Sequence, residues 1–268
     1  MRCMRRATRR LLQLALAGCI AQGVPVAAPP AGAVTIRTEA LLIGDSVMNG
    51  MAQGYGTAAR TQLAARHSFI LDTAGCRRLL GTSCSIGGRP RPTNAITELR
   101  AMAGQYRREL VVAAGYNDPT FGSEGLDLAI TTFLAEAHRQ GVRRVVWLTY
   151  RQAGASARRF AAHNALLRQR ASLDPMLVVA DWATLSAGLP TAWFSGDGIH
   201  LGPEATRAMA DLIGDTLDAI NDQLGDTDCR ITTSTVATAP TTTIARTSLP
   251  TRPARATVAA GRVNLACP

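Results

Sequence analysis

Five short apolar runs, each followed by a stretch with helical spacing, constrain the fold of this chain more than any other feature. The runs are not alternating but apolar throughout, which is typical of strands buried on both faces of a parallel sheet. They lie at residues 40–44, 69–73, 110–114, 145–150 and 177–181. The amphipathic stretches between and after them lie at 47–66, 93–105, 124–140, 156–171 and 203–224. This alternation predicts an α/β fold, a three-layer α/β/α sandwich with about five parallel strands and right-handed crossovers.

The charge of the chain is concentrated at its two ends. The net charge is +10, yet the first ten residues hold five Arg, and residues 226–268 hold five Arg against two Asp. Residues 11–225 therefore carry 19 Arg against 17 acidic residues. Because the charges of residues 11–225 nearly cancel, this part of the chain does not produce the positive field that binds a phosphate backbone. We therefore expect no nucleic-acid partner.

The N-terminus resembles an export signal. An Arg-rich start precedes an apolar stretch at 11–20, which is too short to span a bilayer because that takes about 20 residues. The sequence Leu-Ala-Gly-Cys ending at Cys19 is similar to the lipobox of bacterial lipoproteins, in which the Cys is acylated. The alternatives are an ordinary cleaved signal ending near Ala28 or Ala33 and a twin-arginine signal at 8–12. We expect an exported protein, either secreted or held at the cell envelope by a lipid on Cys19.

Composition divides the chain into three parts. Residues 1–33 form the export signal and an N-terminal tether, and residues 34–225 hold the strand and helix pattern. Residues 226–268 are rich in Thr, Pro and Ala and show no sustained apolar period. Such a segment cannot bury enough surface to offset its ordering entropy, so we predict a flexible tail. We expect one globular domain and a monomer.

The cysteines indicate disulfides rather than a metal site. Of six Cys, Cys3 and Cys19 fall in the signal region, which leaves an even number for an exported chain. Of the three possible pairings of the other four, we expect Cys76 to bond with Cys84, which closes a short Arg- and Gly-rich loop. Cys229 and Cys267 would then pair within the tail. Free thiols are the alternative. No Cys-x-x-Cys or His cluster suggests zinc, and we expect no metal.

The first candidate for chemistry is Ser46. It ends the sequence Gly-Asp-Ser, which follows the first apolar run and enters the stretch expected to be helical. Sites in parallel α/β sheets form at the carboxyl ends of strands, where a helix N-terminus also favours an oxyanion. The competing interpretation is that Asp45 or Ser46 only caps the helix.

The second candidate is the pair Asp197 and His200, just before the last helical stretch. A serine hydroxyl needs a base to take its proton, and an imidazole works best when a carboxylate fixes its tautomer. Residues three apart on one turn can supply both groups. An Asp-Gly turn with an incidental His is the alternative. The other histidines, His67, His138 and His163, are expected at the surface.

Two further residues follow strands and can stabilise a developing oxyanion. Asn117 comes after the third run and can point its amide N–H at the charge, and Gly75 comes after the second run and can offer its backbone N–H. Taken alone, both positions also pass as turn residues.

These four segments resemble the conserved blocks of SGNH/GDSL hydrolases in order and in strand position, over about residues 39–220. The resemblance implies a flavodoxin-like SGNH hydrolase fold, a catalytic triad of Ser46, Asp197 and His200, and an oxyanion hole made by Ser46, Gly75 and Asn117. The strand at residues 145–149 also looks like that of exported actinobacterial members, some of which are fused to membrane acyltransferases.

An α/β-hydrolase elbow is a poor alternative, because Gly-x-Ser-x-Gly would need a second Gly where Met48 stands. We therefore expect an enzyme that cleaves acyl esters of a small molecule or a glycan, as an esterase, lipase or carbohydrate O-deacetylase. The acyl group would pass through Ser46, and no cofactor is implied. A cell-envelope O-acyltransferase with the same triad and a non-catalytic surface-binding module are the two rival hypotheses.

Overall fold

The computed structural model describes residues 38–118 and 122–224, and these contain one five-stranded sheet. All neighbouring strands run parallel, in the order β2-β1-β3-β4-β5. The expectation of a parallel α/β sandwich is confirmed, and the strand order is the flavodoxin-like one. The strands are β1 (Thr38–Gly44), β2 (Phe69–Thr73), β3 (Tyr106–Ala113), β4 (Arg144–Leu148) and β5 (Leu177–Ala180).

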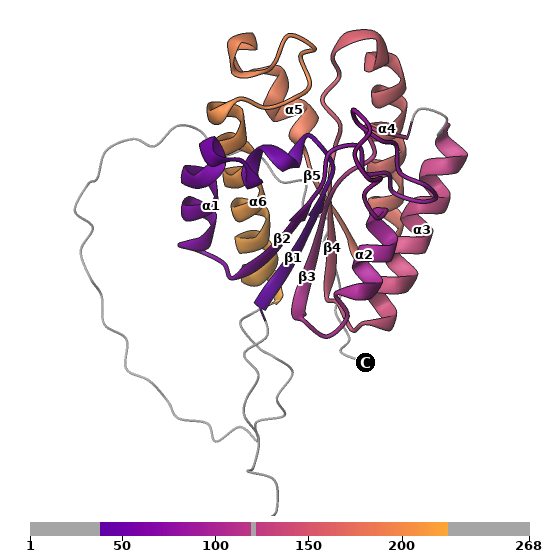
Figure 1. The fold of residues 1–268 in the computed structure, drawn as a ribbon. Coiled ribbons are helices and arrows are strands. Elements are labelled where there is room, and N and C mark those ends of the chain that lie inside the picture. Colours follow the sequence, from indigo (N-terminus) through magenta and orange to yellow (C-terminus); the bar gives the residue numbers. More distant parts are fainter. Residues whose placement is uncertain (1–37, 119–121, 225–268) are drawn as a thin grey trace, which may run out of the picture. The chain divides into compact units, whose positions relative to one another are not determined.

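Helices cover both faces of this sheet (Figure 1). Alternate residues of β1 show the division: Leu41 and Ile43 face one cluster of buried side chains, and Ala40 and Leu42 face the other. The first cluster lies under α2 (Ala95–Ala101), α3 (Ser123–Arg139) and α4 (Ala157–Leu173). The second lies under α1 (Thr57–Ala64), α5 (Trp182–Ala187) and α6 (Pro203–Leu224). The three layers follow from strands that are apolar on both sides.

Some predictions from the sequence concern residues outside the described ranges. The export signal at 1–33 with Cys19, the pair Cys229 and Cys267, and the tail at 226–268 all lie there and stay predictions. Within 38–118 and 122–224, no helix is both long and apolar enough to cross a membrane.

Strand β3 begins at Tyr106, before the apolar run that predicts it. The additional residues at its N-terminal end include two buried charges. Arg108 and Glu109 are both almost fully buried. Arg108 pairs with Glu39 at 3.2 Å, and Glu109 pairs with Arg143 at 2.5 Å. Buried ions persist only where a partner compensates for lost hydration, and the apolar run at 110–114 gave no sign of these tertiary partners.

The helix expected at 47–66 is wrong in its first half. The chain instead forms two 3-10 turns, η1 (Met48–Ala52) and η2 (Gly54–Gly56), before α1 begins. The reason lies in the packing of Gly56, where a Cβ atom would come within 2.2 Å of the Gly50 carbonyl oxygen. The backbone folds on itself where only glycine fits, which a regular helix does not allow.

Helix α5 was not expected from periodicity, because it spans under two turns. What marks the start of α5 is its N-cap, Asp181, whose side chain accepts a hydrogen bond from the Thr184 N–H at 3.3 Å. The same carboxylate accepts from the Thr149 hydroxyl at 2.9 Å, which fixes the end of β5 against the segment after β4.

Gly56→Ala should destabilise the fold. The new methyl group meets fixed backbone atoms of Gly50 and Met51, so the free energy of unfolding should fall by about 1–3 kcal/mol in urea denaturation. The matched control is Gly54→Ala, since nothing lies within 4 Å of a Cβ there, and its effect should stay within about 0.5 kcal/mol. Equal losses in the two variants would contradict this account of the broken helix.

Candidate active site

The candidate residues gather at the carboxyl edge of the sheet. Ser46 follows β1 and Gly75 follows β2, and the last residues of these strands, Gly44 and Thr73, are paired in register. Asn117 follows β3, and β3 pairs with the edge of β1 that is opposite to β2. Because carboxyl ends of parallel strands meet at one edge, the fold brings these segments together.

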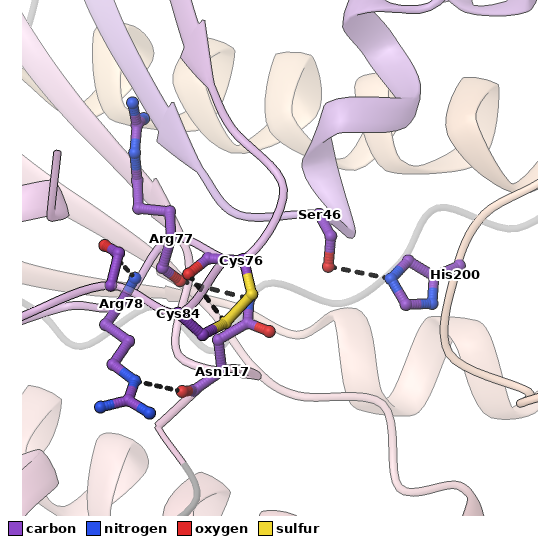
Figure 2. The surroundings of a disulfide bond; sticks show 8 residues. Ser46, Cys76, Arg77, Arg78, Cys84, Asn117 and His200 are labelled. Atoms are coloured by element: carbon purple, nitrogen blue, oxygen red, sulfur yellow. Dashed lines mark hydrogen bonds between the residues drawn. A yellow bond between two sulfur atoms is a disulfide. The ribbon is translucent and has the colours of Figure 1, made fainter. Parts of the chain in front are cut away.

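Ser46, His200 and Asp197 form a continuous hydrogen-bonded chain. The His200 Nε2 atom lies 2.9 Å from the Ser46 hydroxyl oxygen, as Figure 2 shows, and the Nδ1 atom lies 2.5 Å from Asp197 Oδ2. The side chains of His200 and Asp197 are 45% and 47% exposed, so reactants can approach them from solvent. This order of contacts is that of a nucleophile, a base and the carboxylate that orients the base.

A tight loop holds Asp197 and His200. Gly198 has a φ of 71°, in the left-handed region that glycine favours. The Asp197 carboxylate accepts the N–H groups of Ile199 at 2.9 Å and His200 at 3.1 Å. Burial alone would raise the pKa of Asp197, but these hydrogen bonds and that from His200 outweigh it and keep the pKa below its ordinary value. Asp197 is therefore ionised at neutral pH, as an orienting carboxylate must be.

The residue before Ser46, Asp45, is fully buried and joins the segment of Ser46 to the loop after β3. Its carboxylate accepts the N–H groups of Val47 at 2.9 Å, Gly115 at 3.1 Å and Tyr116 at 3.0 Å. Burial raises its pKa to about 6 in spite of these bonds. The sequence indicates only a capping role for Asp45, yet in the structure Asp45 links the segment of Ser46 to the loop that carries Asn117.

Backbone N–H groups are available for an oxyanion at this edge. Within the described part of the chain, the N–H groups of Ser46 and Gly75 donate to no protein acceptor. An unpaired N–H group beside a nucleophile can receive the negative charge of a tetrahedral intermediate. The expected help from a helix is weaker, because η1 and not a regular helix follows Ser46.

Asn117 is held through both its side chain and its backbone. Its Nδ2 group donates to the Arg77 carbonyl at 3.2 Å, which leaves a second N–H on that nitrogen. The backbone carbonyl oxygen of Asn117 accepts the Arg78 Nε–H at 2.9 Å (Figure 2). The loop that follows Gly75 thus holds Asn117 in place.

A disulfide closes that loop, joining Cys76 to Cys84 with Cα atoms 5.2 Å apart (Figure 2). Cys76 has a φ of 65°, and it is the single non-glycine residue with positive φ among those described. It stands third in a turn in which the Arg77 N–H donates to the Ala74 carbonyl at 3.4 Å, a position that usually needs glycine. The disulfide therefore constrains the turn that presents the Gly75 N–H.

Two of the remaining histidines are not surface residues, contrary to expectation. His67 is 5% exposed and contacts Asp218 at 3.0 Å. His163 is 2% exposed and packs edge-on against Tyr150 at 5.7 Å between ring centroids. Their helical surroundings in the sequence gave no information on which helix face meets the core. Neither is hydrogen-bonded to Ser46, Asp197 or His200, and His138 is exposed as expected.

Asp118 was missed by the sequence analysis. It is 1% exposed, and its Oδ2 atom accepts the Leu79 N–H at 3.1 Å, which ties the loop after Asn117 to the disulfide loop. Burial raises its pKa to about 7, so a large fraction is protonated at neutral pH. Its position next to Asn117 was the only available signal.

Metal ligation has no support in residues 38–118 and 122–224, where no group of three or more His, Cys, Asp or Glu side chains could hold an ion.

Solved structures with this fold include an esterase, a member of a lipolytic family and an O-acetyltransferase domain. The psychrotrophic esterase EstA from a Pseudoalteromonas species is 14% identical, with 69% of this chain and 99% of that chain covered and a TM-score of 0.53. A member of the lipolytic G-D-S-L family from Veillonella parvula is 16% identical, with 67% and 98% covered and a TM-score of 0.52. The catalytic domain of peptidoglycan O-acetyltransferase A from Streptococcus pneumoniae is 18% identical, with 71% and 96% covered and a TM-score of 0.50.

These likenesses define the class of the fold, which is the α/β sandwich also found in a G-D-S-L family protein and in an SGNH hydrolase. The sequence matches no protein-family model and, at a significant level, no curated protein.

Asp118→Asn should change the pH dependence of stability. Between about pH 4 and pH 7 the native state holds a proton on Asp118 that the unfolded state has lost, so the free energy of unfolding falls as pH rises. The amide keeps an oxygen for the Leu79 N–H and carries no charge. In urea denaturation, the variant should therefore gain on the order of 4 kcal/mol over wild type between pH 4 and pH 8.

Asp222→Asn, at an exposed position on α6, controls for the loss of one negative charge. A difference between Asp118→Asn and wild type that stays constant with pH would refute the assignment of a buried, protonated carboxyl.

Proposed function

We propose that this protein is a serine ester hydrolase of the SGNH/GDSL type, which transfers the acyl group of its substrate through Ser46. The observation that carries the proposal is the hydrogen-bonded chain from Ser46 through His200 to Asp197. Asp45 and the disulfide loop also hold the segments of Ser46 and Gly75, whose N–H groups donate to no protein acceptor among the described residues, and a structural Ser-His contact would not need such groups.

The first half-reaction forms an acyl-enzyme. The Ser46 oxygen attacks the ester carbonyl while His200 Nε2 takes the hydroxyl proton, and Asp197 stabilises the resulting imidazolium. The N–H groups of Ser46 and Gly75 and the Asn117 amide bind the oxyanion. The bond from the carbonyl carbon to the leaving oxygen then breaks, and His200 returns the proton to that oxygen, which releases an alcohol.

The second half-reaction regenerates Ser46. A water molecule gives its proton to His200 and attacks the acyl carbon, the oxyanion forms again, and the Ser46 oxygen leaves with the proton from His200. The products are a carboxylic acid and the free enzyme. No cofactor takes part in this sequence.

Acyl transfer to an alcohol is the second candidate activity. It uses the same first half-reaction, with a hydroxyl group of an acceptor in place of water. Two observations favour it: His200 and Asp197 are almost half exposed, and one structural neighbour is described as a peptidoglycan O-acetyltransferase domain. The ratio of free acetate to acetylated sugar, measured with a p-nitrophenyl ester as donor and a glycan as acceptor, separates the two activities.

Ser46→Ala should lose at least about 1000-fold in turnover of p-nitrophenyl acetate, because only the attacking oxygen is removed. Labelling by a fluorophosphonate should vanish as well, with thermal unfolding unchanged. Ser195→Ala is the matched control, since this exposed serine lies in the loop that carries Asp197. Turnover by Ser46→Ala at the wild-type rate would remove the proposed function.

The disulfide should matter through the conformation of Cys76. Cys76→Ala with Cys84→Ala leaves an alanine at a φ of 65°, where L-residues other than Gly and Asn cost about 1–2 kcal/mol. We expect kcat/KM to fall about tenfold or more. Cys76→Gly with Cys84→Ala should recover most of that loss, because glycine adopts this φ freely. Identical rates in the two double variants would contradict this role of the disulfide.

A further inference from the structure

Arg151 lies after β4 with its side chain almost fully buried, 9% of the residue being exposed. Within residues 38–118 and 122–224, no carboxylate lies within ion-pair distance of its guanidinium. Burial without an opposite charge lowers the pKa of this arginine. A buried cation is costly, and an apolar side chain of similar length could fill the same space. The contacts of the guanidinium therefore need a reason beyond packing.

Those contacts go to the loop that carries the base and its orienting carboxylate. The Nε–H of Arg151 donates to the Gly198 carbonyl at 2.7 Å, and Gly198 stands between Asp197 and His200. The Nη1 group donates to the Ser186 carbonyl at the end of α5. The guanidinium carbon lies 3.7 Å from the centroid of the Phe194 ring.

Phe194 and Gly198 belong to the same loop. Phe194 forms a β-bridge with Leu201, which closes the loop at its base, and Gly198 lies near its tip. Arg151 thus holds this loop at its base and at its tip, and it anchors both points to α5. Charge-assisted hydrogen bonds to carbonyl oxygens are directional, so they fix the Asp-Gly turn in one place.

The backbone of Arg151 connects to the opposite side of the site. Its N–H group donates to the hydroxyl of Tyr116 at 2.7 Å. Tyr116 in turn donates its own N–H to Asp45, the residue before the nucleophile. One residue therefore joins the loop of Asp197 and His200 to the segments of Ser46 and Asn117.

We infer that Arg151 is a positioning residue for acyl transfer, which sets the distance between His200 and Ser46 by holding the Gly198 carbonyl. This inference rests on the proposed function. Displacing a reacting group by about 1 Å can cost about 100-fold in rate, so loss of these contacts should appear in kcat. Substrate binding should change little, because Arg151 contacts the loop from within the protein.

The test uses Arg151→Met and Arg151→Lys in the full chain, with p-nitrophenyl acetate as substrate. Active sites are counted by the end point of fluorophosphonate labelling, and thermal unfolding is measured beside kinetics. Arg151→Met should lower kcat per labelled site about 10- to 100-fold with KM within about twofold of wild type. In Arg151→Lys, the lysine ammonium can reach one of the two carbonyls, so the kcat of this variant should lie between those of wild type and Arg151→Met.

Arg168→Met is the matched control, since Arg168 is a half-exposed arginine that pairs with Asp181 beside α5 and does not contact the loop. It should keep the wild-type kcat. A purely structural role for Arg151 predicts fewer labelled sites and a lower Tm but an unchanged kcat per site, and that result would overturn the inference. If Arg151→Met does not fold, a wild-type kcat per site in Arg151→Lys overturns it.

Failure of the proposed function would look different. Wild type and Ser46→Ala are measured in the same assay, and equal turnover by these two removes the proposed function. If instead turnover depends on Ser46 and survives intact in Arg151→Met, only the inference about Arg151 is wrong.

Discussion

The carboxylate of Asp45 accepts three backbone N–H groups inside the protein, and the geometry of the candidate site depends on these bonds. A buried acid is favourable only when its oxygens are satisfied, so Val47, Gly115 and Tyr116 must stay where their N–H groups reach it. One bond shapes the turn after Ser46, and two shape the loop that leads to Asn117. Ser46 and the loop of Asn117, a candidate oxyanion donor, are thereby held by the same group.

The other side of the site is held differently. His200 and Asp197 lie on a loop that is close to half exposed, and the bonds within this loop are local ones. Local bonds shape a turn, but they do not fix its distance from a sheet. That distance needs a tertiary contact, and the guanidinium of Arg151 on the Gly198 carbonyl supplies one. The site therefore combines a buried carboxylate on one side with a buried guanidinium on the other.

The sheet could be predicted because strands buried on both faces are apolar throughout. The N-terminal end of β3 could not be predicted, because the charges of Arg108 and Glu109 are compensated by tertiary ion pairs, which leave no local pattern in the sequence. The same division holds at the site. Asp197 and His200 were found together because they share one turn, whereas Asp118 and Arg151 act on backbone groups far away in the sequence. Backbone groups are present at every residue, so they carry no sequence signal.

The proposed hydrolysis requires a covalent acyl group on Ser46, and trapping that intermediate tests it most directly. The protein is mixed with p-nitrophenyl acetate, quenched in acid before turnover is complete, digested and analysed by mass spectrometry. The account predicts one acetyl group on the peptide that contains Ser46, and no acetyl group on that peptide in Ser46→Ala. Turnover that proceeds with the acetyl group on another residue, or with no adduct at all, would contradict it.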